Sequence, residues 1–257
     1  MKILVAGTGF IGSKVKEELE HEHQVKTLDR SEGDFQQDIT EKFDIDEDFD
    51  VLFHTIGLAP GMKNKRLYKE VHVKGTRNLL DAVDSNKVVY LSALGVGKVN
   101  HSFFQTKEKS EEIIKNSERD YTIIRPSTVY GDGNKLLEMI KTAAPSRIFP
   151  DLKTETQPIH IDDLGEILRK SAKDFRNETL EVGGPEKITV GQLAKKLYRE
   201  EGFRCILLPI PEIMQTTALK LTPLSGPFST ENIELLKQQN TTDKNDAERI
   251  LGSLKKV

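Results

Sequence analysis

A glycine-rich turn between a short apolar run and an amphipathic stretch is the feature that most constrains how this chain can fold. Residues 3–6 are apolar and predict a buried strand. Residues 7–12 then carry glycine at the first, third and sixth positions, and residues 11–22 repeat apolar side chains at four-residue spacing, which predicts a helix with one buried face. The pattern therefore predicts a strand, a tight turn and a helix that packs back onto the strand.

The same alternation of strands and helices continues through the first half of the chain. Parallel neighbouring strands need a long connection, which a helix supplies, so alternation of this kind predicts a parallel sheet with helices on both faces. The expected fold class is α/β, a Rossmann-type doubly wound parallel sheet. The predicted strands are residues 3–6, 24–28, 51–54, 88–92 and 121–125, and the predicted helices between them are residues 11–22, 65–83 and 106–116.

The regular alternation of strands and helices ends after residue 126. Beyond it, Pro and Gly cluster at residues 131–134, 145–150, 183–185 and 209–227. We expect a smaller irregular C-terminal lobe over the carboxyl edge of the sheet, with a helix at residues 190–201. The predicted division is a Rossmann-type domain at residues 1–184 and a lobe at residues 185–257. Residues 131–158 are expected on the substrate side of the first domain.

Composition narrows the class of protein. Of 257 residues, 38 are Lys or Arg and 41 are Asp or Glu, so the net charge of −3 offers no cationic field for nucleic acid. No apolar run approaches the roughly 18 residues that a bilayer crossing needs. The lone Cys205 can close no internal disulfide, which favours a reducing cytoplasm. We expect its thiol to be buried and inert. No His, Cys or carboxylate spacing predicts a metal site.

The glycine turn predicts an anion site at the start of the first helix. Gly7 allows the tight turn, Gly9 lets the backbone approach a pyrophosphate, and Gly12 allows close packing of helix and strand. Phe10 and Ile11 complete this predicted dinucleotide-binding loop. A plain glycine turn without a ligand is the alternative.

Acidic residues after the second predicted strand bear on which dinucleotide would bind. Asp29 lies 22 positions beyond Gly7, near the roughly 20-residue offset at which a carboxylate meets the adenosine ribose hydroxyls. This favours NAD(H) over NADP(H), although Arg30 could hold a 2′-phosphate or stack on adenine. Asp38 and Ile39 follow the remnant of a further predicted strand, where the Asp38 carboxylate could meet the adenine amino group, and a solvated loop aspartate is an equal alternative.

The order of these and later motifs resembles the extended and atypical short-chain dehydrogenases/reductases, the family of nucleotide-sugar epimerases and dehydratases. A later Val-Gly-Gly-Pro segment and the Thr-rich C-terminal tail are similar to a narrower branch, the nucleotide-binding accessory subunit of complex I and its relatives. The segments that carry the wider resemblance are residues 7–12, 51–57, 73–82, 88–95, 125–131 and 159–164.

The resemblance implies a Ser, a Tyr and a Lys as catalytic residues, the last two one helical turn apart. Lys107 falls on the Lys, but Phe103 stands at the Tyr position and has no proton to give. Ser92 falls at the serine turn, although many relatives use a second Ser where this chain has Ala93. Taken alone, the charged run around Lys107 is also typical of a solvated helix face.

The resemblance also places residues around a nicotinamide ring, and ordinary turns at strand ends are the alternative for them. Two hypotheses remain open. One is an oxidoreductase or epimerase acting on a sugar nucleotide or small carbonyl compound. The other, which Phe103 favours, is a dinucleotide-binding module that serves a partner protein, with redox catalysis weak, altered or absent. The residues expected at the nicotinamide are Thr55, Ile56 and Gly57 after the strand predicted at residues 51–54, and Pro126, Ser127 and Thr128 after the strand predicted at residues 121–125.

Overall fold

The computed structural model describes residues 1–60, 64–133, 148–200, 202–209 and 238–257. Its centre is a seven-stranded sheet in the order β11-β6-β5-β4-β1-β2-β3, in which every neighbouring pair is parallel. The predicted Rossmann-type α/β fold is therefore confirmed. The strands are β1 (Lys2–Ala6), β2 (Gln24–Asp29), β3 (Phe35–Gln36), β4 (Asp48–His54), β5 (Asp84–Leu91), β6 (Asp120–Pro126) and β11 (Glu178–Val182).

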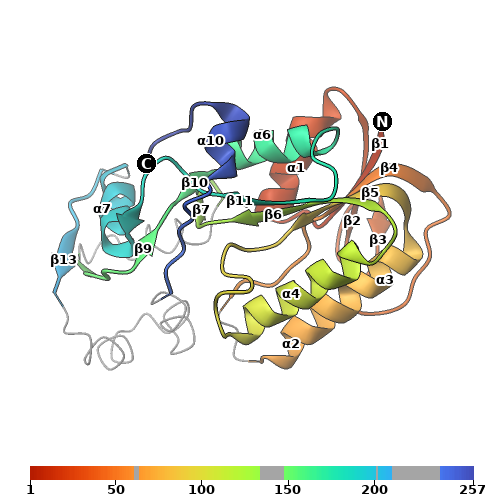
Figure 1. Ribbon diagram of the computed structural model, residues 1–257, viewed down its shortest axis with the longest axis horizontal. Helices are drawn as coiled ribbons and strands as arrows, with labels where there is room; N and C mark the ends of the chain where they lie inside the picture. The colour runs from red at the N-terminus through yellow and green to blue at the C-terminus, as the bar shows by residue number, and fades with distance from the viewer. Residues whose placement is uncertain (61–63, 134–147, 201, 210–237) are drawn as a thin grey trace.

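Helices cover both faces of this sheet (Figure 1). One face carries α1 (Phe10–Glu20), α6 (Ile161–Ser171) and α10 (Asp246–Leu251). The opposite face carries α2 (Arg66–Tyr68), a π-helical segment (Lys69–Lys74), α3 (Gly75–Ala82) and α4 (Ser102–Lys115). The helix predicted over residues 65–83 is thus one continuous helical stretch with a π-helical centre.

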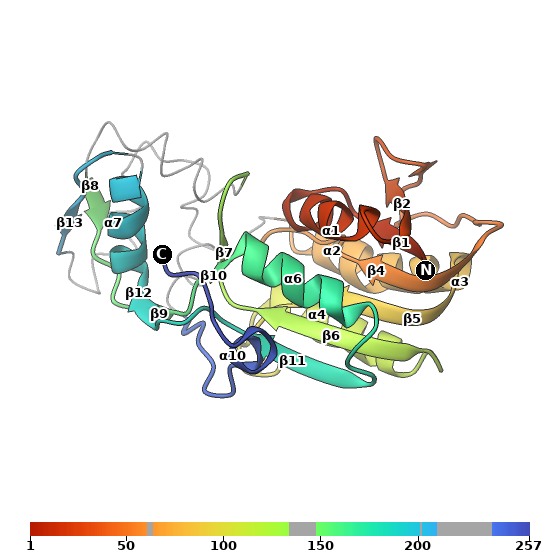
Figure 2. The ribbon, with the colours of Figure 1, turned by 90° about the horizontal axis from the view of Figure 1, so that it is seen from above.

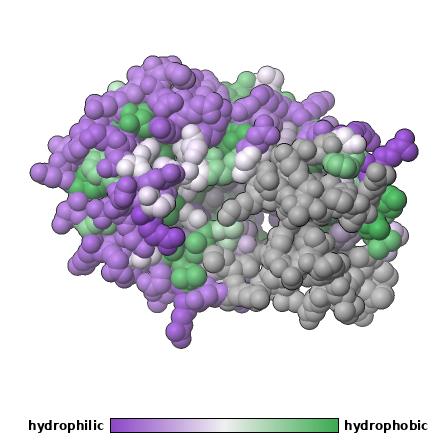
Figure 3. All heavy atoms as spheres, turned by 180° about the vertical axis from the view of Figure 1, so that it is seen from behind, coloured by the Kyte–Doolittle hydropathy of each residue, from purple (hydrophilic) through white to green (hydrophobic). Residues whose placement is uncertain are grey.

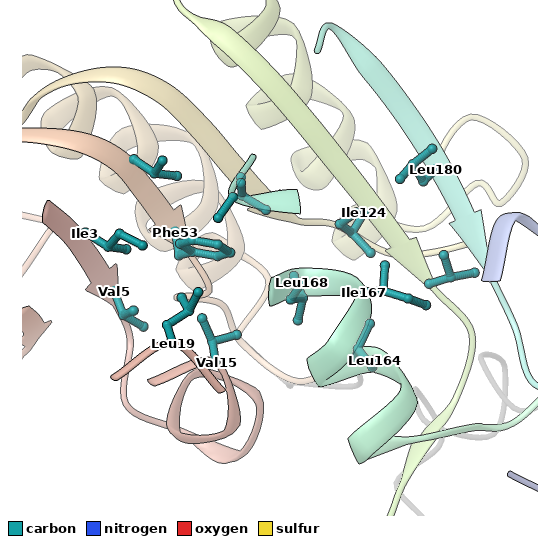
Figure 4. Close-up of a cluster of buried hydrophobic side chains, with 14 of the residues drawn as sticks. Ile3, Val5, Val15, Leu19, Phe53, Ile124, Leu164, Ile167, Leu168 and Leu180 are labelled. Carbon is teal, nitrogen blue, oxygen red and sulfur yellow. The ribbon is translucent and has the colours of Figure 1, made fainter. Parts of the chain in front are cut away.

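The α1 and α6 side of the sheet encloses the larger apolar cluster (Figure 4). Val15 and Leu19 of α1 and Leu168 of α6 are fully buried against strand residues such as Phe53. Full burial of one such side chain stabilises the fold by about 1.5 to 3 kcal/mol. This cluster fixes the position of α1, and with it the turn that precedes the helix.

Helix α4 begins four residues earlier than its predicted start at residue 106. His101 precedes its first turn, and the His101 Nδ1 atom accepts a hydrogen bond from the Phe103 amide at 3.1 Å. A histidine cap is not among the common N-cap signals, so the sequence pattern missed it. The longer helix carries both Phe103 and Lys107 on its buried side.

A smaller group of elements lies beside the main sheet, as Figure 2 shows. Its own apolar cluster joins Tyr130, Phe149 and Leu152 to Leu193 and Leu197 of its helix. The 210–227 part of the predicted Pro/Gly-rich stretch lies outside the described residues. The elements of this region are β7 (Val129–Tyr130), β8 (Ile148–Pro150), β9 (Glu155–Thr156), β10 (Ile159–His160), β12 (Ile188–Thr189), α7 (Val190–Glu200) and β13 (Ile206–Leu208).

The described part of the face in Figure 3 is mostly hydrophilic. On the face shown in Figure 3, apolar side chains gather only in small groups between hydrophilic ones. None of the helices in the described residues is both long and apolar enough to cross a membrane.

Candidate dinucleotide site

The glycine loop follows β1 directly and depends on two of its glycines for its shape. Gly7 has a φ of +101°, which L-residues with side chains rarely adopt. A Cβ atom on Gly12 would lie only 1.7 Å from the Gly7 carbonyl oxygen, so no larger residue fits there. Thr55, directly after β4, supports the loop by donating from Oγ1 to the carbonyl oxygens of Ala6 and Gly7, each at 2.9 Å.

Gly9 faces open space at the start of α1. A Cβ atom on Gly9 would meet no other atom of the described chain within 4 Å. Gly9 is also the N-cap of α1, which has no side-chain cap and no acidic residue in its first turn. The first amides of a helix lack intrahelical partners, so this end presents donors and a positive dipole to an anion. Ile11 packs against the core beneath it, and Phe10 lies beside Gly133.

Asp29 ends β2 beside this loop. One carboxylate oxygen accepts a hydrogen bond from the Thr8 amide at 3.1 Å, and the other accepts from the Ser31 amide at 3.3 Å. Partial burial acts to raise the pKa of Asp29, but the hydrogen bonds from Thr8, Ser31 and Arg30 outweigh it and hold the pKa below its usual value. Asp29 is therefore ionised at neutral pH and able to accept further hydrogen bonds.

Asp38 and Ile39 lie after β3, where they were predicted. The Asp38 carboxylate accepts from the amide and hydroxyl of Thr40, at 2.9 and 2.7 Å. These two bonds, with the nearby charges of Arg30 and Lys74, lower the pKa of Asp38. The Ile39 side chain is buried against Gly75 of α3. Both residues thus have local structural roles that need no ligand.

Lys107 is buried at the carboxyl end of the sheet, not solvated as its charged neighbours suggested. Its side chain is 5% exposed, its Nζ donates to the Leu91 carbonyl oxygen at 2.8 Å, and it lies 4.7 Å from the centre of the Tyr90 ring. Burial lowers the pKa of Lys107 to about 7, against an opposing effect of Glu111. A Cβ atom on Gly57 would lie 3.1 Å from this Nζ, so the backbone of Gly57 packs close to the ammonium.

Phe103 lies one turn before Lys107 and is 6% exposed. Its ring centre lies 5.7 Å from that of Tyr68, 5.5 Å from that of His72 and 5.0 Å from that of Phe104, all with steep interplanar angles. Edge-to-face contacts of this kind add to the stability gained from burial. Phe103 is therefore part of an aromatic cluster, and Tyr68 within that cluster donates its hydroxyl to the Ala59 carbonyl oxygen at 3.1 Å.

His72 is a neutral histidine behind this cluster. Its Nε2 accepts from the Leu58 amide at 3.1 Å, so Nδ1 carries the proton and donates to Thr106 Oγ1 at 2.9 Å. Burial, together with the charge of Lys107, lowers the pKa of His72 to about 2. The bond to Leu58 anchors the chain just after Gly57.

The hydroxyl of Ser92 is directed at a buried ion pair. Ser92 Oγ donates to Glu111 Oε1 at 2.6 Å, and Glu111 is 1% exposed. Arg125 donates to both oxygens of the same carboxylate, from Nε at 2.9 Å and from Nη2 at 2.7 Å. The proton that a catalytic serine would offer to a substrate is therefore used inside the protein.

Ser127 and Thr128 follow Pro126 at the end of β6, as predicted, but the C-terminal segment contacts both. Ser127 Oγ donates to the Asn240 carbonyl oxygen at 2.6 Å. Thr128 Oγ1 lies 2.8 Å from Thr156 Oγ1 and accepts from the Asn240 amide group at 3.2 Å. The two hydroxyls thus stabilise the junction between the sheet and the returning chain.

The sequence analysis did not predict the residues that form hydrogen bonds to several of the predicted site residues. Glu111 lies one helical turn beyond Lys107, which was a usable signal. Asn240 is more than one hundred residues from Ser127, and no local pattern connects them. Glu32 also escaped notice, and its Oε1 accepts a hydrogen bond from Thr8 Oγ1 at 3.0 Å.

The described residues contain no group of His, Cys, Asp or Glu side chains that could hold a metal ion. Cys205 is buried, and burial raises the pKa of its thiol, so the thiolate form is disfavoured.

A family described as NAD(P)H-binding matches residues 6–149, more than half of the chain. The chain belongs to this family. The match begins at the last residue of β1 and includes the whole glycine loop, Asp29, Lys107 and Ser127. NAD(P) binding and the predicted resemblance to atypical short-chain dehydrogenases/reductases are thereby confirmed.

A relative identified by sequence similarity supports this family assignment. The 40 kDa subunit of mitochondrial NADH-ubiquinone oxidoreductase from Neurospora crassa is 25% identical over 157 residues, which cover 59% of this chain and 42% of that subunit. The chain thus matches less than half the length of this relative.

Two solved structures share the fold over nearly the whole chain. MoeE5 in complex with UDP-glucose and NAD has a TM-score of 0.74 at 18% identity, covering 100% of this chain and 94% of that one. The dTDP-4-dehydrorhamnose reductase from Bacillus anthracis in complex with NADP has a TM-score of 0.74 at 17% identity, covering 99% and 94%. One holds NAD and the other NADP, so the fold alone does not select the dinucleotide.

Proposed function

We propose that this protein is an NAD(H)-binding module whose redox catalysis is weak, altered or absent. The adenosine end of the site comprises the glycine loop, residues 7–12, and Asp29. The nicotinamide end comprises Ser92, Phe103, Lys107, Ser127 and Thr128, with residues 55–57 and Pro126 beside them. Bound NAD(H) would supply a nicotinamide ring that accepts or gives a hydride.

The adenosine end has the features that a dinucleotide requires. The space beyond Gly9 and the uncapped start of α1 suit a pyrophosphate. Asp29 is ionised and can accept hydrogen bonds from both hydroxyls of the adenosine ribose. A 2′-phosphate would instead meet that negative charge, which supports NAD(H) over NADP(H). Asp38 and Ile39 would border the adenine.

Lys107 suits a ribose at the nicotinamide end. An ammonium has three donors, and within the described residues Lys107 uses one of them, toward Leu91. Gly57 lies beside the same Nζ atom, where a larger residue would crowd it. A ribose hydroxyl in reach of this Nζ would satisfy a buried donor.

The observation that carries the proposal of weak catalysis is Phe103, which lies one turn from Lys107 with no proton to donate. Loss of one positioned general acid costs about 10² to 10⁴ in rate. The hydroxyl of Ser92 is committed to Glu111, so it supplies no replacement.

A module of this kind would act through a protein partner, as part of a larger assembly. The matched relative in Neurospora crassa is a subunit of an oxidoreductase, which supports this role without defining the partner. We propose residues 1–184 as the unit that binds the dinucleotide and residues 185–257 as a smaller lobe next to it, from which α10 returns to the main sheet. Residues 131–158, of which 134–147 lie outside the described residues, would contribute to the substrate side.

Calorimetric titration of the purified protein with NAD(H) and NADP(H) tests the binding proposal. We expect saturable binding of NAD(H) and weaker binding of NADP(H). A lack of binding of either dinucleotide at millimolar concentration would overturn the proposal.

The second candidate function is an active oxidoreductase or epimerase on a sugar nucleotide or small carbonyl compound. The lowered pKa of Lys107, about 7, favours it because a buried amine near neutrality can exchange protons. This candidate predicts turnover that Lys107→Ala abolishes. Steady-state assays with aldehydes and sugar nucleotides, run on both proteins, distinguish the two functions.

A further inference from the structure

Two carboxylates, not one, contact the glycine loop. Asp29 accepts from the Thr8 amide at 3.1 Å, and Glu32 accepts from the Thr8 hydroxyl at 3.0 Å. Thr8 lies between the first two glycines of the loop, so both acidic groups border the same part of the predicted site. Glu32 comes from the short connection between β2 and β3.

The connection holds Glu32 in place through hydrogen bonds at both ends. Near its start, the amide and hydroxyl of Ser31 donate to Asp29. Near its end, Asp34 accepts from the amide and hydroxyl of Thr27, at 2.8 and 3.0 Å. Gly33 turns the chain between them with a φ of +100°. The resulting tight loop brings Glu32 back over Thr8.

We infer that Glu32 is a second specificity residue, which acts with Asp29 to exclude a 2′-phosphate from the adenosine ribose. The inference rests on the proposed NAD(H) site and adds a residue to it. NAD carries hydroxyls on that ribose, whereas NADP carries a phosphate with nearly two negative charges at pH 7. Two carboxylates around Thr8 repel the added phosphate, a charge that NAD does not carry on that ribose.

Arg30 is the cation that would be expected to offset this repulsion. Its charge helps to lower the pKa of Asp38, which follows β3. No hydrogen bond joins Arg30 to Glu32 within the described residues. Within the described residues Arg30 forms no ion pair with Asp29 or Glu32, so neither carboxylate beside Thr8 is neutralised by direct contact.

Glu32→Gln tests the inference because glutamine keeps an oxygen that can accept from Thr8 while it removes the charge. We expect the dissociation constant of NADP to fall by about three- to tenfold, because one unit of negative charge is removed and salt screens part of its effect. The dissociation constant of NAD should change by less than about twofold. The control is Glu112→Gln, which removes an equal charge from the exposed side of α4 and should change neither constant. Calorimetric titration of each variant gives both constants.

Repeating the titrations at high salt shows whether Glu32→Gln acts by removing charge repulsion or by changing the structure of the loop. At 1 M salt the screening length is about 3 Å, so the gain in NADP binding by Glu32→Gln should largely disappear. An unchanged NADP to NAD ratio in Glu32→Gln, with NAD binding intact, would overturn this inference alone, as would an equal loss of both affinities. If the unmodified protein bound no NAD, the proposed function would fail and the inference with it.

Discussion

The proposed adenosine end and the proposed nicotinamide end differ in what occupies the positions that a ligand would contact. At the adenosine end, Gly9 borders open space and α1 begins without a cap. At the nicotinamide end, the protein itself engages the hydroxyls: Ser92 donates to Glu111, and Ser127 donates to Asn240. Phe103 is packed among aromatic rings.

This difference indicates that binding and chemistry are separable in a fold of this type. A dinucleotide draws much of its recognition from the pyrophosphate and the adenosine ribose, which the first βα turn supplies. Hydride chemistry also needs a positioned proton donor, and here the hydroxyls serve internal hydrogen bonds. Within the described residues, the contacts of Ser92, Ser127 and Phe103 are with other parts of the protein and stabilise the fold.

The largest expected effect comes from Glu111→Ala, which removes the carboxylate shared by Ser92 and Arg125. Removing one member of a buried pair costs about 3 kcal/mol, toward the lower limit for such pairs because Arg125 is partly exposed. For a protein of this size the melting temperature should fall by roughly 6 to 12 °C. Calorimetric melting measures it, and Glu112→Gln on the same helix is the exposed control.

The same variant also tests whether the two ends of the proposed site are independent of each other. If the ends are independent, NAD affinity measured well below the melting temperature should stay within about twofold, the usual range for uncoupled sites. A large loss of NAD affinity in folded Glu111→Ala protein would show that the nicotinamide end controls binding.

A second change acts on the adenosine end alone. Gly9→Val places a side chain where the pyrophosphate would lie, so NAD affinity should fall by at least about 100-fold, or 2.7 kcal/mol. Gly9 has a φ of −69° and an open Cβ direction, so stability should change by less than about 0.5 kcal/mol.

Gly12→Ala provides the contrast, because its Cβ would collide with the Gly7 carbonyl oxygen and destabilise the fold. Titration and melting of both variants give the comparison. Normal NAD binding by Gly9→Val would mean that the pyrophosphate lies elsewhere.

The third effect is a pH dependence that originates at the nicotinamide end. His72 has a pKa of about 2 in the folded protein and near 6.5 when unfolded. Between these values the unfolded state binds one proton more, so this residue lowers stability by about 1.4 kcal/mol per pH unit as pH falls from 6 to 4. Buried His54, with a pKa of about 3, acts in the same direction.

In His72→Gln the dependence of unfolding free energy on pH should therefore decrease by about 1.4 kcal/mol per pH unit in this range. Urea unfolding at several pH values measures the slope. The same slope in the variant and the unmodified protein would show that His72 accepts a proton without unfolding.

The sequence predicted the features that depend on local pattern. The order of strands, the glycine loop and the position of Asp29 at the end of β2 follow from apolar periodicity and residue offset. The burial of Lys107 did not follow from pattern, because its helix turn is rich in charge and only the packing against Tyr90 and Gly57 removes it from water.

Features set by tertiary contacts could not be predicted. Glu32 reaches Thr8 because Asp34 is bonded to Thr27, a contact that depends on how the β2–β3 connection folds. Asn240 reaches Ser127 across most of the sequence. In both cases the residue type is common in solvated loops, so composition gives no signal.

The most direct test of the account is a hydride-transfer measurement on the unmodified protein. The protein is saturated with NADH, as established by titration, and NADH oxidation is followed with a panel of aldehydes, ketones and sugar nucleotides. The account predicts bound NADH and a rate at background, because Phe103 provides no proton and Ser92 donates to Glu111. Turnover at ordinary enzyme rates of about 1 s⁻¹ or more, abolished by Lys107→Ala, would contradict it.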